Sequence, residues 1–243
     1  VQGHLRPVDE YPDQRNGHCQ PGYRTTAFHL ISPPASRSRG AGGKFPPGCV
    51  HHPGLRSGML RILHIIPAVA PRYGGPSEMV FGICRHLDRR GHQTTILTSD
   101  ADGSGTLPVR YGETVEFRGV STRFFPRRWS ESFKIAPGMA NWLREHIGEF
   151  DIVHLHAVFS WSTMVGGKIC LQRNVPYVVR PFGCLDPWSL SQRGWLKRIL
   201  MEVVVRHILH HENAIHYTSE LERQAAESSL GLKKGRVIAN AVT

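Results

Sequence analysis

The regular alternation of short apolar runs with helix-like segments, which starts at Met59, is what most limits the folds open to this chain. Residues 60–66 (LRILHII) form an apolar run of strand length, whereas residues 76–91 space their apolar side chains three and four apart, as helices do. Residues 93–99 (QTTILTS) predict the next strand. Strands that alternate with helices indicate an α/β fold with a mainly parallel sheet and helices on both faces.

The alternation continues towards the end of the chain. We expect one or two strands within 115–125, further strands over 151–158, 176–181, 213–219 and 236–240, and helices over 136–150, 162–174, 187–211 and 220–231. The helix over 187–211 carries an apolar stripe and a basic rim, which fit either a sheet-covering helix or one that lies on an anionic membrane surface. Because open parallel sheets bind ligands at the carboxyl ends of their strands, functional residues are expected just after each strand.

Residues 1–58 differ from the remainder of the chain. They contain eight prolines, nine glycines, seven basic and three acidic residues, and one short apolar run, TTAFHLI. Such a composition buries too little apolar surface to offset the entropy of ordering, so we expect disorder. We interpret this segment as a spurious extension of the reading frame ahead of a natural start at Met59, and a basic tail that binds an anion is the alternative. The folded domain is expected over residues 59–243.

The net charge of +11 favours an anionic partner. Nucleic acid is disfavoured because basic and aromatic residues are rarely interleaved and no RNA-binding motif is present, which leaves a phosphorylated substrate or an anionic membrane surface. The five cysteines are odd in number and widely spaced, which argues against a disulfide framework and for a reducing compartment. We therefore expect a cytoplasmic protein, either free or peripheral at the inner face of the membrane.

The loop after the first predicted strand contains a glycine pair. Gly74 and Gly75 let the backbone approach a ligand closely, and free amides at the start of the following helix can hold a phosphate. The alternative is a tight strand-to-helix turn that needs glycine for packing alone. The loop is neither a G-x-G-x-x-G fingerprint nor a P-loop, since the spacing and the lysine are missing.

Two histidines lie on the strand predicted over 151–158. Alternation places His154 and His156 on one face. His156 lies at the carboxyl end, where its side chain reaches a ligand, whereas His154 lies one step deeper and is expected to be structural, shielded by the following helix. H-x-H spacing can chelate a metal, but the sequence shows no third ligand, so no metal is expected.

The loop after residues 176–181 holds two further candidates. Arg180 ends the strand and suits a phosphate or a carboxylate. Asp186 precedes Pro187, so it is either the N-cap of the next helix or a ligand contact. No G-x-S-x-G, H-E-x-x-H or clearly spaced carboxylate pair positions a nucleophile. The pattern alone indicates an α/β protein that binds an anionic ligand at the carboxyl edge of its sheet.

Five segments, in order, resemble the family four retaining glycosyltransferases. They are residues 60–99 with their G-G loop and R-G-H turn, FDIVHLHAVFS, VVRPFGCLDPWSLSQRGWLKRIL, AIHYTSELE and RVIANAV. The third is similar to the R-P-x-G-x-L-D-P-W segment of a branch that builds bacterial polysaccharides. The chain departs from the family at Ala239 and Ala241, where many members have proline and glycine, and at Phe182, where related branches have histidine.

The resemblance implies a glycosyltransferase B-type fold, in which two Rossmann-like domains face each other across a cleft. Residues 59–243 would be the N-terminal, acceptor-side domain. A hexosyl group would pass from a nucleoside diphosphate sugar to a lipid-linked or oligosaccharide acceptor in cell-surface polysaccharide biosynthesis, with retained configuration and without a metal or other cofactor. Because the second domain normally makes most nucleotide contacts, the chain alone is expected to be inactive.

The resemblance also implies roles for the candidate residues. Gly74 and Gly75 match the loop near the donor phosphates, and His156 matches a histidine near the transferred sugar. Arg180 and Asp186 are weaker matches in the substrate-binding region. A non-catalytic module that binds a sugar nucleotide or another anion, or a truncated remnant, is the alternative to an enzyme.

The composition break at Met59 predicts the outcome of limited proteolysis. Trypsin should remove residues 1–58 rapidly and leave a stable product that starts near Met59, because a segment without a core gives no protection to its backbone. Mass spectrometry of the digest measures this. A tail that resists cleavage and unfolds cooperatively with the domain would contradict the prediction.

Overall fold

The structure is a computed structural model that describes residues 58–129, 131–185, 189, 206–233 and 235–240, all within one compact unit. The segment 1–57 and Asp186 lie outside the described residues. So does most of the helix expected over 187–211, of which α6 (Arg206–His211) is described. The expectations for these parts stay predictions.

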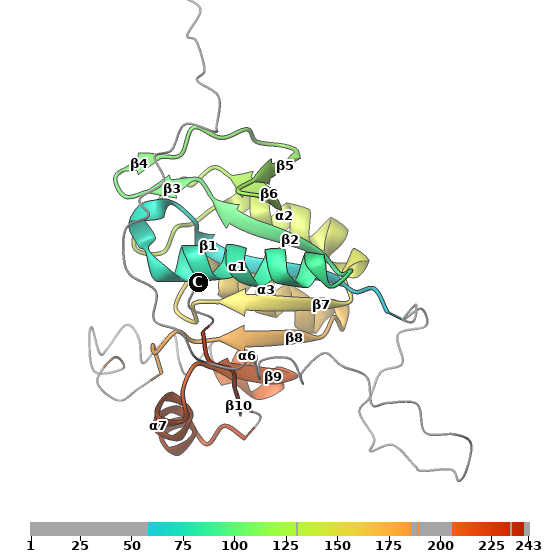
Figure 1. The fold of residues 1–243 in the computed structure, drawn as a ribbon. Helices are drawn as coiled ribbons and strands as arrows, with labels where there is room; N and C mark the ends of the chain where they lie inside the picture. The colour runs from blue at the N-terminus through green and yellow to red at the C-terminus, as the bar shows by residue number, and fades with distance from the viewer. Residues whose placement is uncertain (1–57, 130, 186–188, 190–205, 234, 241–243) are drawn as a thin grey trace, which may run out of the picture. The chain divides into compact units, whose positions relative to one another are not determined.

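Within the described residues, eight strands form one sheet in the order β10-β9-β8-β7-β1-β2-β6-β5. They are β1 (Arg61–Ala68), β2 (Gln93–Ser99), β5 (Thr114–Phe117), β6 (Val120–Phe125), β7 (Ile152–His156), β8 (Tyr177–Arg180), β9 (Ala214–Tyr217) and β10 (Gly235–Val237). Only β5 and β6 pair antiparallel among these neighbours. The predicted Rossmann-like, mainly parallel sheet is confirmed (Figure 1).

Helices cover both faces of this sheet. They are α1 (Gly75–Arg89), α2 (Pro137–His146), α3 (Trp161–Arg173), α6 and α7 (Glu220–Leu230), with short 3-10 turns η1 (Pro71–Tyr73) and η2 (Ile147–Glu149). Figure 1 shows α1 on the face opposite α2 and α3. The segment predicted as one helix over 136–150 is divided into α2 and η2, and the short hairpin of β3 (Ala101–Asp102) and β4 (Gly105–Thr106) was not predicted.

Alternation along β1 separates two hydrophobic cores. Leu63 and Ile65 point into the core that is shared with α2 and α3, whereas Ile66 packs with Val80 and Phe81 of α1. All five side chains are buried. Because His64 precedes Ile66 by two residues, its side chain lies on the same face of the sheet as Ile66, the face that packs against α1.

A glycine pair lets α3 lie close against the sheet. A Cβ built on Gly166 would meet Ile65 Cδ1 and Leu155 Cδ2 at 2.9 Å, and one on Gly167 would meet Ile208 Cγ2 at 2.7 Å. The close approach fixes α3, and with it the loop that leaves the carboxyl end of β7.

The Gly167 contact predicts a cost for adding one methyl group. Gly167→Ala should lower the free energy of unfolding by about 1–3 kcal/mol, because overpacking against Ile208 outweighs the better helix propensity of alanine. Gly82→Ala in α1, where an added Cβ meets nothing within 4 Å, should instead stabilise by about 0.5–1 kcal/mol. Urea denaturation of both variants measures the difference, and equal stabilisation by the two would refute the packing.

Candidate functional site

The glycine loop lies between β1 and α1 at the carboxyl edge of the sheet. Gly74 has φ +65°, a left-handed conformation that glycine adopts without strain, and it is the N-cap of α1. A Cβ built on Gly74 or Gly75 would meet no heavy atom within 4 Å. Packing therefore does not require these glycines, and the open space beside both of them fits the close approach of a ligand to the start of α1.

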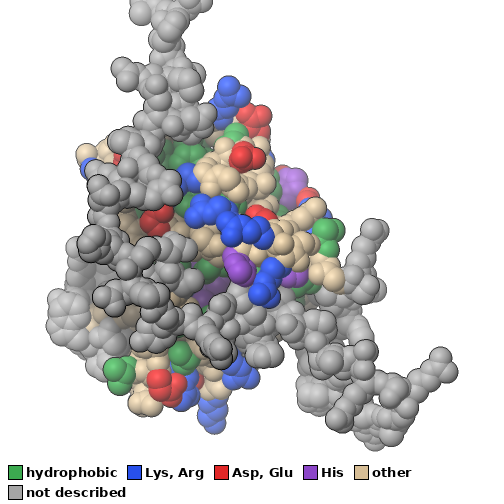
Figure 2. Space-filling view, in the orientation of Figure 1, with side chains coloured by type: hydrophobic (Ala, Val, Ile, Leu, Met, Phe, Trp, Pro, Cys, Tyr) green, Lys and Arg blue, Asp and Glu red, His purple; other side chains and the backbone are tan. Residues whose placement is uncertain are grey.

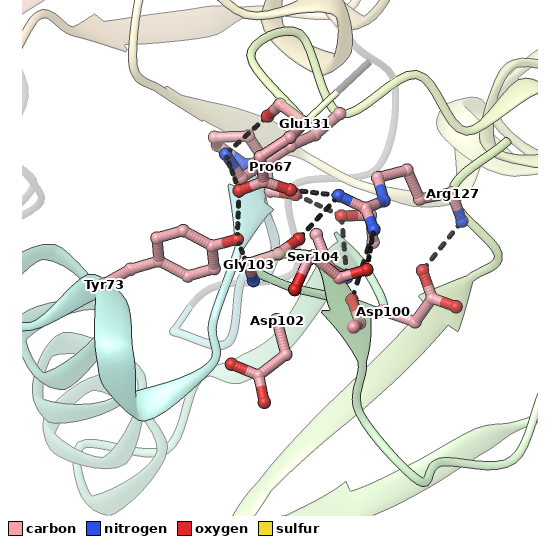
Figure 3. Close-up of polar contacts among 12 residues, drawn as sticks. Pro67, Tyr73, Asp100, Asp102, Gly103, Ser104, Arg127 and Glu131 are labelled. Carbon is pink, nitrogen blue, oxygen red and sulfur yellow. Dashed lines mark hydrogen bonds and ion pairs between the residues drawn. The ribbon is translucent and has the colours of Figure 1, made fainter. Parts of the chain in front are cut away.

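A polar network holds the turn that precedes the glycine loop (Figure 3). The Tyr73 hydroxyl donates to Glu131 Oε1 at 2.6 Å and accepts from the Gly103 amide at 2.9 Å. Burial and the hydrogen bond to Glu131 raise the pKa of Tyr73 to about 12, so the phenol stays protonated. Tyr73 thus ties η1 to the β3–β4 hairpin and to the segment after β6.

Arg127 and Asp100 complete this network. The Arg127 guanidinium forms an ion pair with Glu131 and donates to the Gly103 carbonyl at 2.8 Å, and its backbone amide donates to Asp100 Oδ1 at 2.7 Å. Asp100 also accepts from the Tyr111 hydroxyl at 2.7 Å. These residues were not predicted from the sequence, although Asp100 directly follows the strand predicted over 93–99.

Histidines from three strands gather on the α1 face of the sheet. His64 of β1 lies in register with His154 of β7, and the ring centroids of His154 and His156 are 4.2 Å apart. His64 Nδ1 and His156 Nε2 form a hydrogen bond of 3.1 Å. His216 of β9 stacks on His154 at 5.5 Å. Alternation correctly placed His154 and His156 on one face, but it did not reveal His64 or His216.

Two sequence expectations about these histidines need correction. The helix α3 packs on the opposite face, against Leu155, so it does not shield His154, which is partly exposed. His156 lies at the carboxyl end of β7, as expected, and is fully buried, so its contact with a ligand stays a prediction. The second correction concerns the third ligand that the sequence did not show. His64 lies close to His154 and His156 because β1 pairs with β7, although His64 and His154 are 90 positions apart in the sequence.

Burial keeps the imidazoles neutral. Desolvation, reinforced by the charge of Arg180, lowers the pKa of His64 to about 3, that of His216 to about 4 and that of His156 well below 6.5. The atoms His64 Nε2, His154 Nε2 and His156 Nδ1 are buried and have no hydrogen-bond partner among the described residues. Such groups are costly unless a ligand completes them.

Arg180 ends β8 beside His156, with which it is in register. Only 1% of the residue is exposed, and its Nη2 donates to Asn240 Oδ1. Its guanidinium carbon lies 5.0 Å from the Phe182 ring centroid, and Phe182 in turn stacks on His156 at 5.7 Å. Burial lowers the pKa of Arg180 to about 10, so the side chain stays cationic at neutral pH. Within the described part of the chain, Nε and Nη1 have no partner.

The chain turns sharply after β7 and β8. Ala157 has φ +69° and Phe182 has φ +55°, left-handed conformations that cost free energy in residues with a side chain. Thr163 Oγ1 donates to the His156 carbonyl at 2.8 Å, and Glu222 accepts from the Gly183 amide at 2.6 Å and from Thr218. These bonds hold the strained turns. Sequence reasoning missed Glu222, which lies three residues inside α7.

These residues lie at the carboxyl ends of the neighbouring parallel strands β1, β7 and β8 and form a candidate site with three parts. Gly74 and Gly75 offer backbone space, His156 offers one neutral nitrogen, and Arg180 offers a buried cation whose Nε and Nη1 have no partner among the described residues. Figure 2 shows further Lys and Arg side chains gathered on the face that carries α1. The arrangement suits a ligand with anionic groups and hydroxyls.

A family model described as Glycosyltransferase Family 4 matches residues 73–243, which is more than half of the chain. The chain belongs to glycosyltransferase family 4. The resemblance of the sequence segments to glycosyltransferase family 4 is thereby confirmed at the level of the family. No curated protein sequence matches this family 4 chain.

Solved structures share the fold. Anabaena Alr3699/HepE, crystallised with UDP and glucose, matches with a TM-score of 0.52 at 18% identity, over 75% of this chain and 45% of that one. An S. aureus MnaA–UDP co-structure matches with a TM-score of 0.51 at 11% identity, over 75% and 45% of the two chains. A putative UDP-N-acetylglucosamine 2-epimerase from Listeria monocytogenes gives 0.50 at 13% identity with the same coverage of 75% and 45%. The family 4 chain thus spans less than half the length of these structures, and at such identities the likeness shows the fold alone.

In the part of the chain that the structure describes, no helix is both long and apolar enough to cross a membrane.

The buried histidines predict that acid destabilises this family 4 domain. The folded-state pKa values of about 3 for His64 and about 4 for His216 lie below the unfolded value of 6.5, so the unfolded chain binds more protons as pH falls. Each histidine should therefore remove up to roughly 1.4 kcal/mol of stability per pH unit below about pH 6.5. Urea denaturation between pH 7 and pH 5 measures the slope.

Two variants test whether the slope comes from the buried rings. His216→Phe removes one of them and should flatten the dependence of stability on pH, whereas His210→Gln removes an exposed histidine and should leave it unchanged. A slope that responds equally to both substitutions would show that the buried imidazoles are not its source.

Proposed function

We propose that this family 4 chain is the acceptor-side half of a retaining glycosyltransferase. It would help to transfer a hexosyl group from a nucleoside diphosphate sugar to a lipid-linked or oligosaccharide hydroxyl during cell-surface polysaccharide biosynthesis. A second Rossmann-like domain, which would bind most of the nucleotide, would complete the active site. The observation that carries the proposal is the set of buried nitrogens of His156 and Arg180 that have no partner among the described residues, at the ends of β7 and β8.

The roles of the residues follow from their chemistry. Gly74 and Gly75 leave space for the diphosphate at the start of α1, where the helix dipole favours negative charge. Arg180 would stabilise the anionic charge that grows on the leaving diphosphate, since its guanidinium is buried and cationic. His156 Nδ1 would hydrogen-bond a hydroxyl of the transferred sugar.

The reaction needs no nucleophile from the chain. As the bond between the anomeric carbon and the diphosphate breaks, the acceptor oxygen would bond to the same face, and a leaving phosphate oxygen would accept the acceptor proton. The chain would then act by positioning both substrates and by stabilising charge, which fits the absence of a readable nucleophile motif. No metal or other cofactor takes part in this scheme.

The acceptor side supports a membrane-proximal variant of the proposal. Lys and Arg side chains gather on the face that carries α1 (Figure 2), and the sequence of α1 includes Arg85 and Arg89. Such a surface would favour an anionic lipid-linked acceptor and a peripheral position at the cytoplasmic face of a membrane. Asp186, which lies outside the described residues, stays a proposed substrate contact.

Replacement of His156 by glutamine tests the site. Gln can keep a hydrogen bond to His64 through its amide, as His156 Nε2 does, but it lacks a nitrogen at the Nδ1 position. In the chain joined to a family 4 donor-binding domain, His156→Gln should lower turnover by about 10²-fold, because a positioned contact in the transition state is lost. Transfer of radiolabelled hexose, measured with EDTA present, gives turnover per folded molecule.

The matched control is His154→Gln, which removes a neighbouring imidazole without a proposed sugar contact and should keep turnover within a few-fold. The chain without a donor-binding domain should show no transfer. Near-normal turnover of His156→Gln would contradict its role. Robust transfer by the chain alone would contradict the half-enzyme proposal, and sugar-nucleotide binding without transfer in every combination would favour a non-catalytic binding module.

A further inference from the structure

Three imidazoles on two neighbouring strands lie close enough to share one ion. His64 of β1 and the pair His154 and His156 of β7 can each offer one nitrogen such that all three lie within 4.8 Å of one another. Their ring centroids are 4.2 to 5.4 Å apart. Among the described residues, no other set of three histidine, cysteine or acidic side chains has this geometry.

We propose that His64, His154 and His156 form a binding site for a divalent transition-metal ion of the zinc class. Imidazole nitrogen is a ligand that zinc, copper, nickel and cobalt share, and three such ligands leave a fourth position open to water or to a ligand oxygen. The site shares His156 with the proposed sugar transfer, which itself requires no metal. It would join β1 to β7 at the centre of the sheet.

The distances suit such an ion. His64 Nδ1 and His156 Nε2 are 3.1 Å apart, and two nitrogens of a tetrahedral zinc site are separated by about 3.3 Å. The longest nitrogen separation, within 4.8 Å, must shorten by up to roughly 1.5 Å, which a rotation of the partly exposed His154 ring can supply. The strands themselves need not move, because β1 and β7 are already paired in register at His64 and His154.

The hydrogen bonds of the cluster leave room for an ion. The bond between His64 and His156 satisfies one nitrogen on each of these two rings and none on His154, whose Nε2 is buried without a partner in the described residues. An ion in place of this bond would bind all three rings. With the ion on His64 Nδ1 and His156 Nε2, the second nitrogens of the two rings would carry the protons and could donate to further groups, as in other metal-binding histidines.

The positive charge of Arg180 weakens the binding of a cation nearby, which provides a test of where the ion binds. Its buried guanidinium lies on the neighbouring strand, in register with His156, and its positive charge must weaken the binding of a cation. His216, which stacks on His154, is the other basic side chain at the cluster. Arg180→Met should therefore tighten metal binding at the cluster by about tenfold or more, an effect that a surface site would not show.

Titration of the full chain with Co²⁺ tests the proposal. Visible absorption distinguishes the intense bands of four-coordinate cobalt from the weak bands of cobalt bound octahedrally by exposed histidines. We expect one equivalent to give the four-coordinate spectrum and Zn²⁺ to displace it. His64→Gln should weaken this binding by about 100-fold or more, since it removes one of three ligands.

The control variant is His207→Ala with His211→Ala, which removes an exposed histidine pair on α6 whose ring centroids are 4.3 Å apart. It should leave the four-coordinate signal unchanged. The proposal is overturned if only octahedral cobalt is seen, if the signal survives His64→Gln, or if it disappears with the α6 pair. Circular dichroism checks the fold of His64→Gln. If that variant does not fold, Arg180→Met decides alone, because unchanged cobalt affinity there overturns the proposal.

Discussion

The burial of imidazoles and a guanidinium on one face of the central strands is the constraint on which the rest of this structure depends. His64, His156, Arg180 and His216 are each at most 6% exposed, and desolvation lowers the pKa of every one of them. Polar groups placed out of water cost free energy unless they are hydrogen-bonded, and several of these nitrogens have no partner in the described residues. A sheet face designed for stability alone would carry valine or isoleucine here, so the polar face indicates a ligand.

The apolar face supplies the stability that this polar face lacks. Leu63, Ile65 and Leu155 pack beneath α3, whose Gly166 and Gly167 bring the helix backbone close to them and to α6. The loop after β7 leads into α3, so the packing of α3 on the sheet also fixes this loop. The position of His156 at the end of β7 therefore depends on the core of the opposite face. Ala157, which follows β7, has an unfavourable left-handed conformation. The packing of α3 and the hydrogen bond from Thr163 to the His156 carbonyl stabilise this turn.

The sequence predicted the α/β class, the order of the elements and the edge at which the ligand groups lie, because these follow from hydrophobic periodicity and the direction of parallel strands. It could not predict contacts between strands that are distant in sequence. In the sequence, His64 is one residue of an apolar strand. Its place beside His154 follows from the pairing of β1 with β7, which the sequence does not show. The face that α3 covers was also wrongly assigned, since alternation shows that His154 and Leu155 point in opposite directions but not which of them meets the helix. Likewise, Tyr73 and Arg127 share Gly103 and Glu131 as polar partners, although the loops that carry these residues have no common motif.

The charge of Arg180 shows how the fold keeps a cation available. The charge of Glu222 raises the pKa of Arg180 against the larger effect of burial. The carboxylate of Glu222, however, is already used by the Gly183 amide and by Thr218, so it orders the two loops and leaves the guanidinium unneutralised. Phe182 then covers the guanidinium and His156 together, which excludes water from both without a competing anion. A buried cation held in this way gains more from an anionic ligand than an exposed one would, because the interaction is not screened by solvent.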